Sequence, residues 1–151
     1  MQSDIIMDLK EKSYSTELRV KTSEEDAFEA LSTKIGDWWG DQDKTAQQLG
    51  DVFTMSWGEP WYKFKIVEYV PNKKITWECI DSKQIIGDLD GVEKEWVGTQ
   101  LQWTINKLNE GEIELQFRHE GLVPEFICYD FCSNTWNRFI EFNLKKYLER
   151  S

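Results

Sequence analysis

The sequence predicts an α+β domain in which a curved antiparallel sheet of about six strands wraps around a long C-terminal helix. Apolar residues alternate with polar ones over several short segments between residues 14 and 119, which is the pattern of half-buried strands. After residue 124 the spacing changes to three and four residues, which is typical of an amphipathic helix. The 151 residues contain no Pro/Gly/Ser-rich linker, so a single domain is expected.

The first strand is expected over residues 14–21, because its apolar residues share one face. Ser23 then begins a capping box, in which its hydroxyl accepts a hydrogen bond from the amide three residues on. Acidic residues fill the following turn, and apolar residues recur at helical spacing, so a helix is expected from about Glu24 to Lys34. Residues 35–40, with glycines on both sides of a Trp pair, indicate a break and a short helical turn.

Several strand patterns follow one another after a polar loop. Their alternating apolar residues are Phe53, Met55 and Trp57; Tyr62, Phe64 and Ile66; Ile75, Trp77 and Cys79; Val97, Thr99, Leu101, Trp103 and Ile105; and Ile113, Leu115, Phe117 and His119. Turn signals at Pro71-Asn72 and Asn109-Glu110-Gly111 separate neighbouring strands, and residues 81–95 are expected to form a long loop. The order is that of an antiparallel meander with one buried face.

A long amphipathic helix is expected from about Pro124 to Arg150. Pro124 suits the first turn of a helix, and Glu125 suits the positive end of its dipole. The inward positions are Tyr129, Cys132, Trp136, Phe139, Ile140, Asn143, Leu144, Tyr147 and Leu148. We expect this helix to bury its apolar face in the concavity of the sheet.

Composition limits the partners that the protein can have. The net charge of −10 repels nucleic-acid phosphates and anionic lipids, so neither nucleic acid nor membrane insertion is expected. No segment approaches the roughly 20 apolar residues that cross a bilayer, and no basic leader precedes the first apolar run, which predicts a cytoplasmic protein. Cys79, Cys128 and Cys132 form an odd set, which favours reduced thiols over a disulfide framework.

The order of these elements, with His119-Glu120-Gly121-Leu122 and the stretch from Cys128 to Trp136, resembles the START-like (SRPBCC) superfamily. The branch it resembles is the C-terminal domain of the activator of the ninety-kilodalton heat-shock protein ATPase, in its stand-alone bacterial form. That resemblance covers about residues 14–148 and implies a helix-grip fold over residues 14–151, after an N-terminal extension of residues 1–13. It also implies a cavity between sheet and helix, which the superfamily uses for lipids, polyketides, hormones and other apolar molecules.

A cavity is also indicated by the aromatic residues themselves. The residues expected to line it are Trp39, Phe53, Trp57, Phe64, Trp77, Trp103, Phe117, His119, Tyr129, Trp136 and Ile140. The alternative is that these rings fill a closely packed core. Buried indole and phenol groups need hydrogen-bond partners, which favours a cavity. Trp38, Trp39 and Trp61 are expected to be exposed, at a pocket mouth or at a homodimer interface.

His119 is the sole histidine and is either a polar anchor for the ligand or a structural histidine whose hydrogen bonds are satisfied in the core. Cys128 and Cys132 lie four residues apart and could add two zinc ligands to it. Free cysteines commonly pack as small apolar residues, so neither a metal nor a cofactor is expected.

Carboxylates near the expected pocket mouth have two interpretations. Asp37 and Asp41 beside the Trp pair, and Glu93 and Glu95 in the long loop, could select a cationic or hydroxylated ligand. Acids on loops usually face solvent, which is the favoured interpretation. Only Asp81, at a strand end, is placed so that it could act as an acid or base in the cavity.

Three functions therefore remain. Non-catalytic binding of a small apolar or aromatic ligand is expected, because aromatic residues are abundant and no nucleophile–base pair or metal set is evident. A cyclase or hydrolase acting on a polyketide-like or lipid substrate is the enzymatic alternative. The third is a chaperone-associated interaction protein, which the family resemblance implies.

Overall fold

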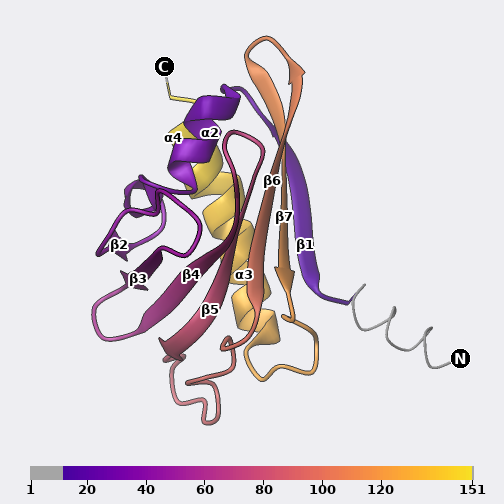
Figure 1. Cartoon of the computed structure of the whole chain (residues 1–151). Helices are drawn as coiled ribbons and strands as arrows, with labels where there is room; N and C mark the ends of the chain where they lie inside the picture. The colour runs from indigo at the N-terminus through magenta and orange to yellow at the C-terminus, as the bar shows by residue number, and fades with distance from the viewer. Residues whose placement is uncertain (1–11, 151) are drawn as a thin grey trace, which may run out of the picture.

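The computed structural model describes residues 12–150, in which seven antiparallel strands form one sheet in the order β1-β7-β6-β5-β4-β3-β2. The strands are β1 (Tyr14–Val20), β2 (Asp41–Gln42), β3 (Val52–Ser56), β4 (Trp61–Val70), β5 (Lys74–Lys83), β6 (Gln100–Asn109) and β7 (Glu112–Glu120). The sheet curls around the C-terminal helical segment, as Figure 1 shows, so the expected α+β helix-grip architecture is confirmed. The expected N-terminal extension lies, for residues 1–11, outside the described residues.

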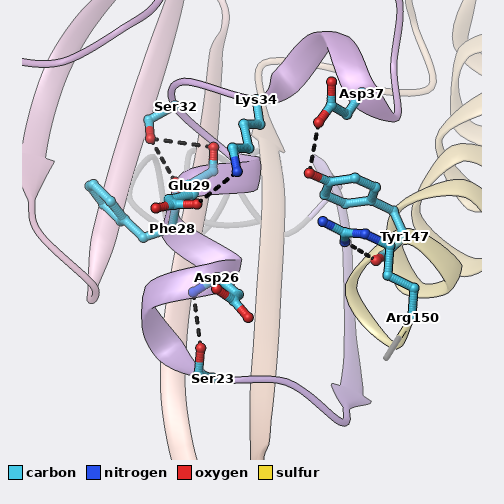
Figure 2. A network of polar contacts seen from close by, with 9 residues as sticks. All are labelled: Ser23, Asp26, Phe28, Glu29, Ser32, Lys34, Asp37, Tyr147 and Arg150. Carbon is cyan, nitrogen blue, oxygen red and sulfur yellow. Dashed lines mark hydrogen bonds and ion pairs between the residues drawn. The ribbon is translucent and has the colours of Figure 1, made fainter.

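Helix α2 (Glu24–Ala30) begins where the capping box predicts, because the Ser23 hydroxyl accepts from the Asp26 amide at 3.0 Å. It ends four residues earlier than expected. The Ser32 hydroxyl donates to the Phe28 carbonyl at 2.7 Å (Figure 2), and such a local side-chain bond competes with helix continuation. A short 3₁₀ turn, Ile35–Asp37, then leads into the Trp pair, as the glycines indicated.

The loop between β5 and β6 is shifted toward the C-terminus relative to its expected bounds. Strand β5 continues to Lys83, because its last residues pair with β4 as far as Trp61. The loop therefore covers residues 84–99, and Val97, which was expected to face the core from a strand, lies on it and is exposed.

The C-terminal helical segment begins at Tyr129, not at Pro124, and consists of α3 (Tyr129–Arg138), a π-helical segment (Phe139–Leu144) and α4 (Lys145–Leu148). Buried residues recur every four positions from its N-cap onward, at Cys128, Cys132, Trp136, Ile140, Leu144 and Leu148. In a regular α-helix a step of four residues drifts by about 40° around the axis. The wider π turn corrects this drift, so the later leucines return to the sheet.

The hydrophobic core lies between the concave face of the sheet and the helical segment, with α2 against its upper part (Figure 1). Tyr14 on β1 and Asn137 on α3 are joined by a side-chain hydrogen bond, which fixes the helix against the edge of the sheet. Across residues 12–150, no helix has the length and apolar character needed to cross a membrane.

Candidate functional site

A cavity of about 200 Å³ opens between α3, the β3–β4 hairpin and the loop of residues 84–99. Its lining is almost wholly apolar and includes four tryptophans. The lining residues are Trp39, Trp57, Pro60, Tyr62, Ile85, Ile86, Trp96, Phe131, Cys132, Thr135, Trp136 and Phe139. An aromatic pocket with a few polar groups is a typical small-molecule site.

Trp136, in the middle of α3, organises the aromatic wall of this pocket. Its ring stacks on Trp39 with centroids 5.1 Å apart and lies nearly parallel to Trp96 at 5.8 Å. Trp57 meets the Trp39 ring edge-on at 4.9 Å and donates its indole N–H to the Trp39 carbonyl at 2.8 Å. Tyr62 packs on Trp96 at 4.3 Å. Such aromatic pairs hold one another in fixed orientations, so the wall is preorganised.

The Trp pair is held in place from the far end of the helical segment. Tyr147 on α4 donates to the carboxylate of Asp37 at 2.8 Å, as Figure 2 shows, and Asn143 donates to the Trp38 carbonyl at 3.3 Å. Gly40 follows the pair, and a methyl group there would lie 2.6 Å from the Trp57 ring. The close approach of the turn to Trp57 therefore requires glycine.

Glu95 joins the loop of residues 84–99 to the start of α3. Its two carboxylate oxygens accept from the amides of Ile127 at 2.7 Å and Cys128 at 3.0 Å. The favoured interpretation of Glu95 as a solvated loop acid is therefore wrong. Cys128 is the N-cap of α3, so these two amides lack partners within the helix and lie at the positive end of its dipole, which is why they attract this carboxylate.

His119 is fully buried in a closed chain of hydrogen bonds. Its Nδ1 accepts from the Trp136 indole N–H at 3.0 Å, so its Nε2 carries the proton and donates to the Thr99 hydroxyl at 2.8 Å. Thr99 in turn donates to the Trp96 carbonyl at 2.6 Å. Burial lowers the pKa of His119 to about 3, so the ring is neutral near pH 7.

Two titratable side chains line the pocket, and both are neutral. The Tyr62 hydroxyl donates to the Gln84 side-chain oxygen at 2.6 Å, and burial raises the pKa of Tyr62 well above its usual value. Hydrogen bonding with Cys128, together with burial, raises the pKa of Cys132. The pocket thus offers van der Waals contact and desolvation, with neither a charged nucleophile nor an ionised acid or base on its walls.

The structure places the sequence-predicted cavity residues in two groups. Trp39, Trp57 and Trp136 line the pocket. The remaining eight lie outside the lining. Tyr129 is partly buried, and the other seven are buried in the closed core: Phe53, Phe64, Trp77, Trp103, Phe117, His119 and Ile140. Trp38 and Trp39, expected to be exposed, are 4% and 6% exposed, because their rings pack on Trp103 and Trp136.

The polarity argument for a cavity is weaker in the structure than in the sequence. The indole N–H groups of Trp38, Trp57, Trp77 and Trp136 all find partners within the protein, three of them backbone carbonyls of α2 and the segment after it. The Trp96 and Trp103 N–H groups, in contrast, are buried without a hydrogen-bond partner. For the first four tryptophans, therefore, burial does not by itself indicate a wet cavity.

The hydrogen bonds of His119 also argue against a zinc site formed with Cys128 and Cys132. Both His119 nitrogens are engaged by Trp136 and Thr99, so the ring cannot turn a lone pair toward Cys128 and Cys132. Residues 12–150 contain no cluster of three or more His, Cys, Asp or Glu side chains able to hold a metal ion. All three cysteines are buried and free.

Most of the pocket residues that sequence reasoning missed lie on the loop and on the outer flank of α3. Ile85, Ile86 and Trp96 belong to a segment without regular alternation, so no periodic pattern indicates their direction. Phe139 was predicted to face inward from the last helix but was not assigned to the cavity. Phe131 lies eight residues before it, and this helical spacing is the signal that could have indicated Phe131.

Comparison with solved structures places this fold among known ones. Aha1 from Colwellia psychrerythraea, solved as a dimer, is similar with a TM-score of 0.73 and 21% identity over 91% of this chain and 96% of that one. An HSP90 activator from Plasmodium falciparum gives a TM-score of 0.66 and 14% identity over 91% of this chain and 96% of that one. The resemblance expected from the sequence is thus confirmed at the level of the fold.

A third similar structure is DynU16, from the dynemicin biosynthetic locus, with a TM-score of 0.69 and 15% identity. It covers 91% of this chain, whereas this chain covers 47% of DynU16. No family model and no curated protein sequence matches the chain. The similarity to these structures is one of fold, and the function has to be argued from the pocket.

Proposed function

We propose that this protein binds a small apolar or aromatic molecule in the pocket beside α3, without transforming it chemically. The observation that carries this proposal is the cavity of about 200 Å³, which is bounded by four tryptophans and whose lining includes the exposed side chains of Ile85 and Phe131. A dry cavity of about 150 Å³ is already large enough to bind benzene. The size of the pocket therefore suits a compound of one or two rings.

The enzymatic alternative draws little support from the pocket walls. His119 has no free nitrogen, is neutral, and lies behind Trp136 and Trp96, which separate it from the cavity. Tyr62 and Cys132 have raised pKa values, so neither is poised to exchange a proton near neutral pH. Asp81 pairs with Lys94 at 2.7 Å and does not reach the lining.

A chaperone-associated role is the second candidate, and it is favoured by the fold similarity to Aha1 and to the Plasmodium HSP90 activator. Such a role would use the surface of the domain. Exposed apolar side chains near the pocket mouth, including Ile127 and Phe131, each 53% exposed, are the available contact points. A homodimer, as in the Colwellia structure, would use the same kind of surface. We also infer a cytoplasmic location, which suits three free cysteines.

Native mass spectrometry of the purified protein, with a tryptophan fluorescence titration by an apolar dye, tests the binding proposal. The wild type is expected to retain a small molecule or to bind the dye saturably at one site per chain. Thr135→Phe fills the cavity from α3 and is expected to abolish binding, whereas Asn134→Phe, on the exposed face of the same helix, is expected to preserve it. Equal saturable binding by both variants, or none by the wild type, would move the function to the interaction role.

A further inference from the structure

We propose that the pocket discriminates between ligands by charge, accepting neutral and cationic aromatic compounds such as aromatic amines and rejecting aromatic carboxylates. This inference rests on the proposed function and adds the chemical class of the ligand to it. Four features carry it: the absence of a lysine or arginine among the lining residues, the ion pairs of Lys83 and Lys94, the occupied amides just before α3, and exposed acids without ion pairs on the lining segments.

No base is available to a carboxylate inside the pocket. None of the twelve lining residues is a lysine, an arginine or a histidine. Two lysines near the loop of residues 84–99 are already engaged: Lys83 pairs with Glu59 at 3.2 Å, and Lys94 pairs with Asp81 at 2.7 Å while it lies over the Trp61 ring. A carboxylate that enters the pocket therefore loses its water without gaining a cationic partner, which is unfavourable.

The start of α3, which could otherwise bind an anion, is also occupied. The amides of Ile127 and Cys128, just before its first residue, both donate to the carboxylate of Glu95. A ligand carboxylate would have to displace Glu95 from these amides and would then lie next to that displaced charge. The helix terminus thus reinforces the rejection of anions.

Acidic side chains lie on the loop and on the helix that contribute to the pocket lining. Asp88 and Asp90 lie on the same loop as Ile85 and Ile86, and Asp130 precedes Phe131 on α3. All three are exposed, and none of them forms an ion pair within residues 12–150. Together with the net charge of −10, they attract a positively charged ligand toward this part of the surface and repel a negative one.

The aromatic walls favour the same selection. Trp57, Trp96, Trp136 and Tyr62 border the cavity, and the faces of such rings attract a cation once it has lost part of its water. The chain already uses this contact where Lys94 lies 5.4 Å from the centroid of Trp61. A protonated amine can therefore enter a pocket that has no carboxylate of its own.

Three ligands with one bicyclic skeleton test the proposal: naphthalen-2-ylmethylamine, which is protonated at neutral pH, naphthalen-2-ylmethanol and 2-naphthoate. Their dissociation constants are measured by isothermal titration calorimetry at low salt. The amine and the alcohol are expected to bind, and the naphthoate to bind at least about tenfold more weakly, a difference of about 1.4 kcal/mol. Naphthoate binding as tight as that of the alcohol would overturn the charge selection and leave the binding proposal intact. Failure of all three to bind would overturn the binding proposal as well.

A charge change at the mouth makes the test specific to this site. Ile85 lines the pocket and is 42% exposed, so Ile85→Lys places a cation there without disturbing the core. It is expected to strengthen naphthoate binding at least about threefold and to weaken amine binding. Leu49→Lys makes the same charge change at an exposed residue outside the lining and is expected to leave the order of the three ligands unchanged. An equal shift in both variants would show that net charge, and not the pocket mouth, determines selection.

Discussion

Acidification from pH 7 to pH 5 is expected to destabilise this protein through one residue, His119. The ring is fully buried and its pKa is lowered to about 3, whereas in the unfolded chain it returns to about 6.5. Below pH 6.5 the unfolded chain therefore binds a proton that the folded protein does not. The stabilisation is complete above pH 6.5 and is lost progressively as the pH falls toward 3.

The magnitude follows from the pKa difference. A pH of 5 is about 1.5 units below the pKa of the histidine in the unfolded chain, so the free energy of unfolding falls by about 2 kcal/mol relative to pH 7. The other groups with shifted pKa values do not interfere in this range. The pKa values of the exposed carboxyls Asp81 and Glu110 are lowered by their lysine partners, so both stay ionised in the folded protein above pH 5.

Urea unfolding followed by tryptophan fluorescence at pH 7 and pH 5 measures this effect. His119→Asn is the matched control, because its Oδ1 is bonded to Cγ, as the Nδ1 that accepts the Trp136 indole N–H is, while the side chain no longer titrates. The variant is expected to be less stable overall but to change by less than about 0.5 kcal/mol between the two pH values. A wild type insensitive to this pH change, or an equal loss in the variant, would refute the description of His119 as a neutral core residue.

Two further predictions concern the supports of the pocket. Glu95→Gln leaves one carbonyl oxygen for two amides and removes the charge at the start of α3. It should lower the free energy of unfolding in urea by about 1 kcal/mol. The control Glu93→Gln, at an exposed side chain, should change it by less than about 0.5 kcal/mol. Gly40→Ala places a methyl 2.6 Å from the Trp57 ring, so it should lower the free energy of unfolding by about 1–3 kcal/mol and weaken dye binding. In Gly36→Ala the nearest contact of the added methyl is 3.3 Å, so the loss of stability should be smaller. Equal stability losses within either pair would contradict the contacts described.

The strands and their inward faces could be predicted from the sequence because alternation with period two is a local property. Phe117 and His119 on β7 face the core as expected, opposite Trp103 and Leu101 on β6. The start of the last helix could not be predicted in the same way. Pro124 satisfies the local preference for a first turn, but the helix begins at Tyr129, after the amides that Glu95 holds from more than thirty residues away.

The pocket itself was predictable only in part. Periodicity separates inward from outward residues, which identified Trp57 and Trp136 among the inward rings. It does not tell which inward ring borders a void, because a void depends on the packing of all neighbours together. Trp77 and Phe64 were therefore assigned to a cavity, although their neighbours fill the space around them completely.

The central claim, that the pocket beside α3 binds an apolar aromatic molecule, is tested most directly by intermolecular nuclear Overhauser effects. The measurement uses isotope-labelled protein saturated with naphthalen-2-ylmethanol. Contacts are expected between the ligand protons and the side chains of Trp57, Trp96, Thr135 and Phe139, with none to the closed core. Saturating binding whose contacts fall on the convex face of the sheet, or the absence of any contact with these four residues, would contradict the assignment of this pocket as the binding site.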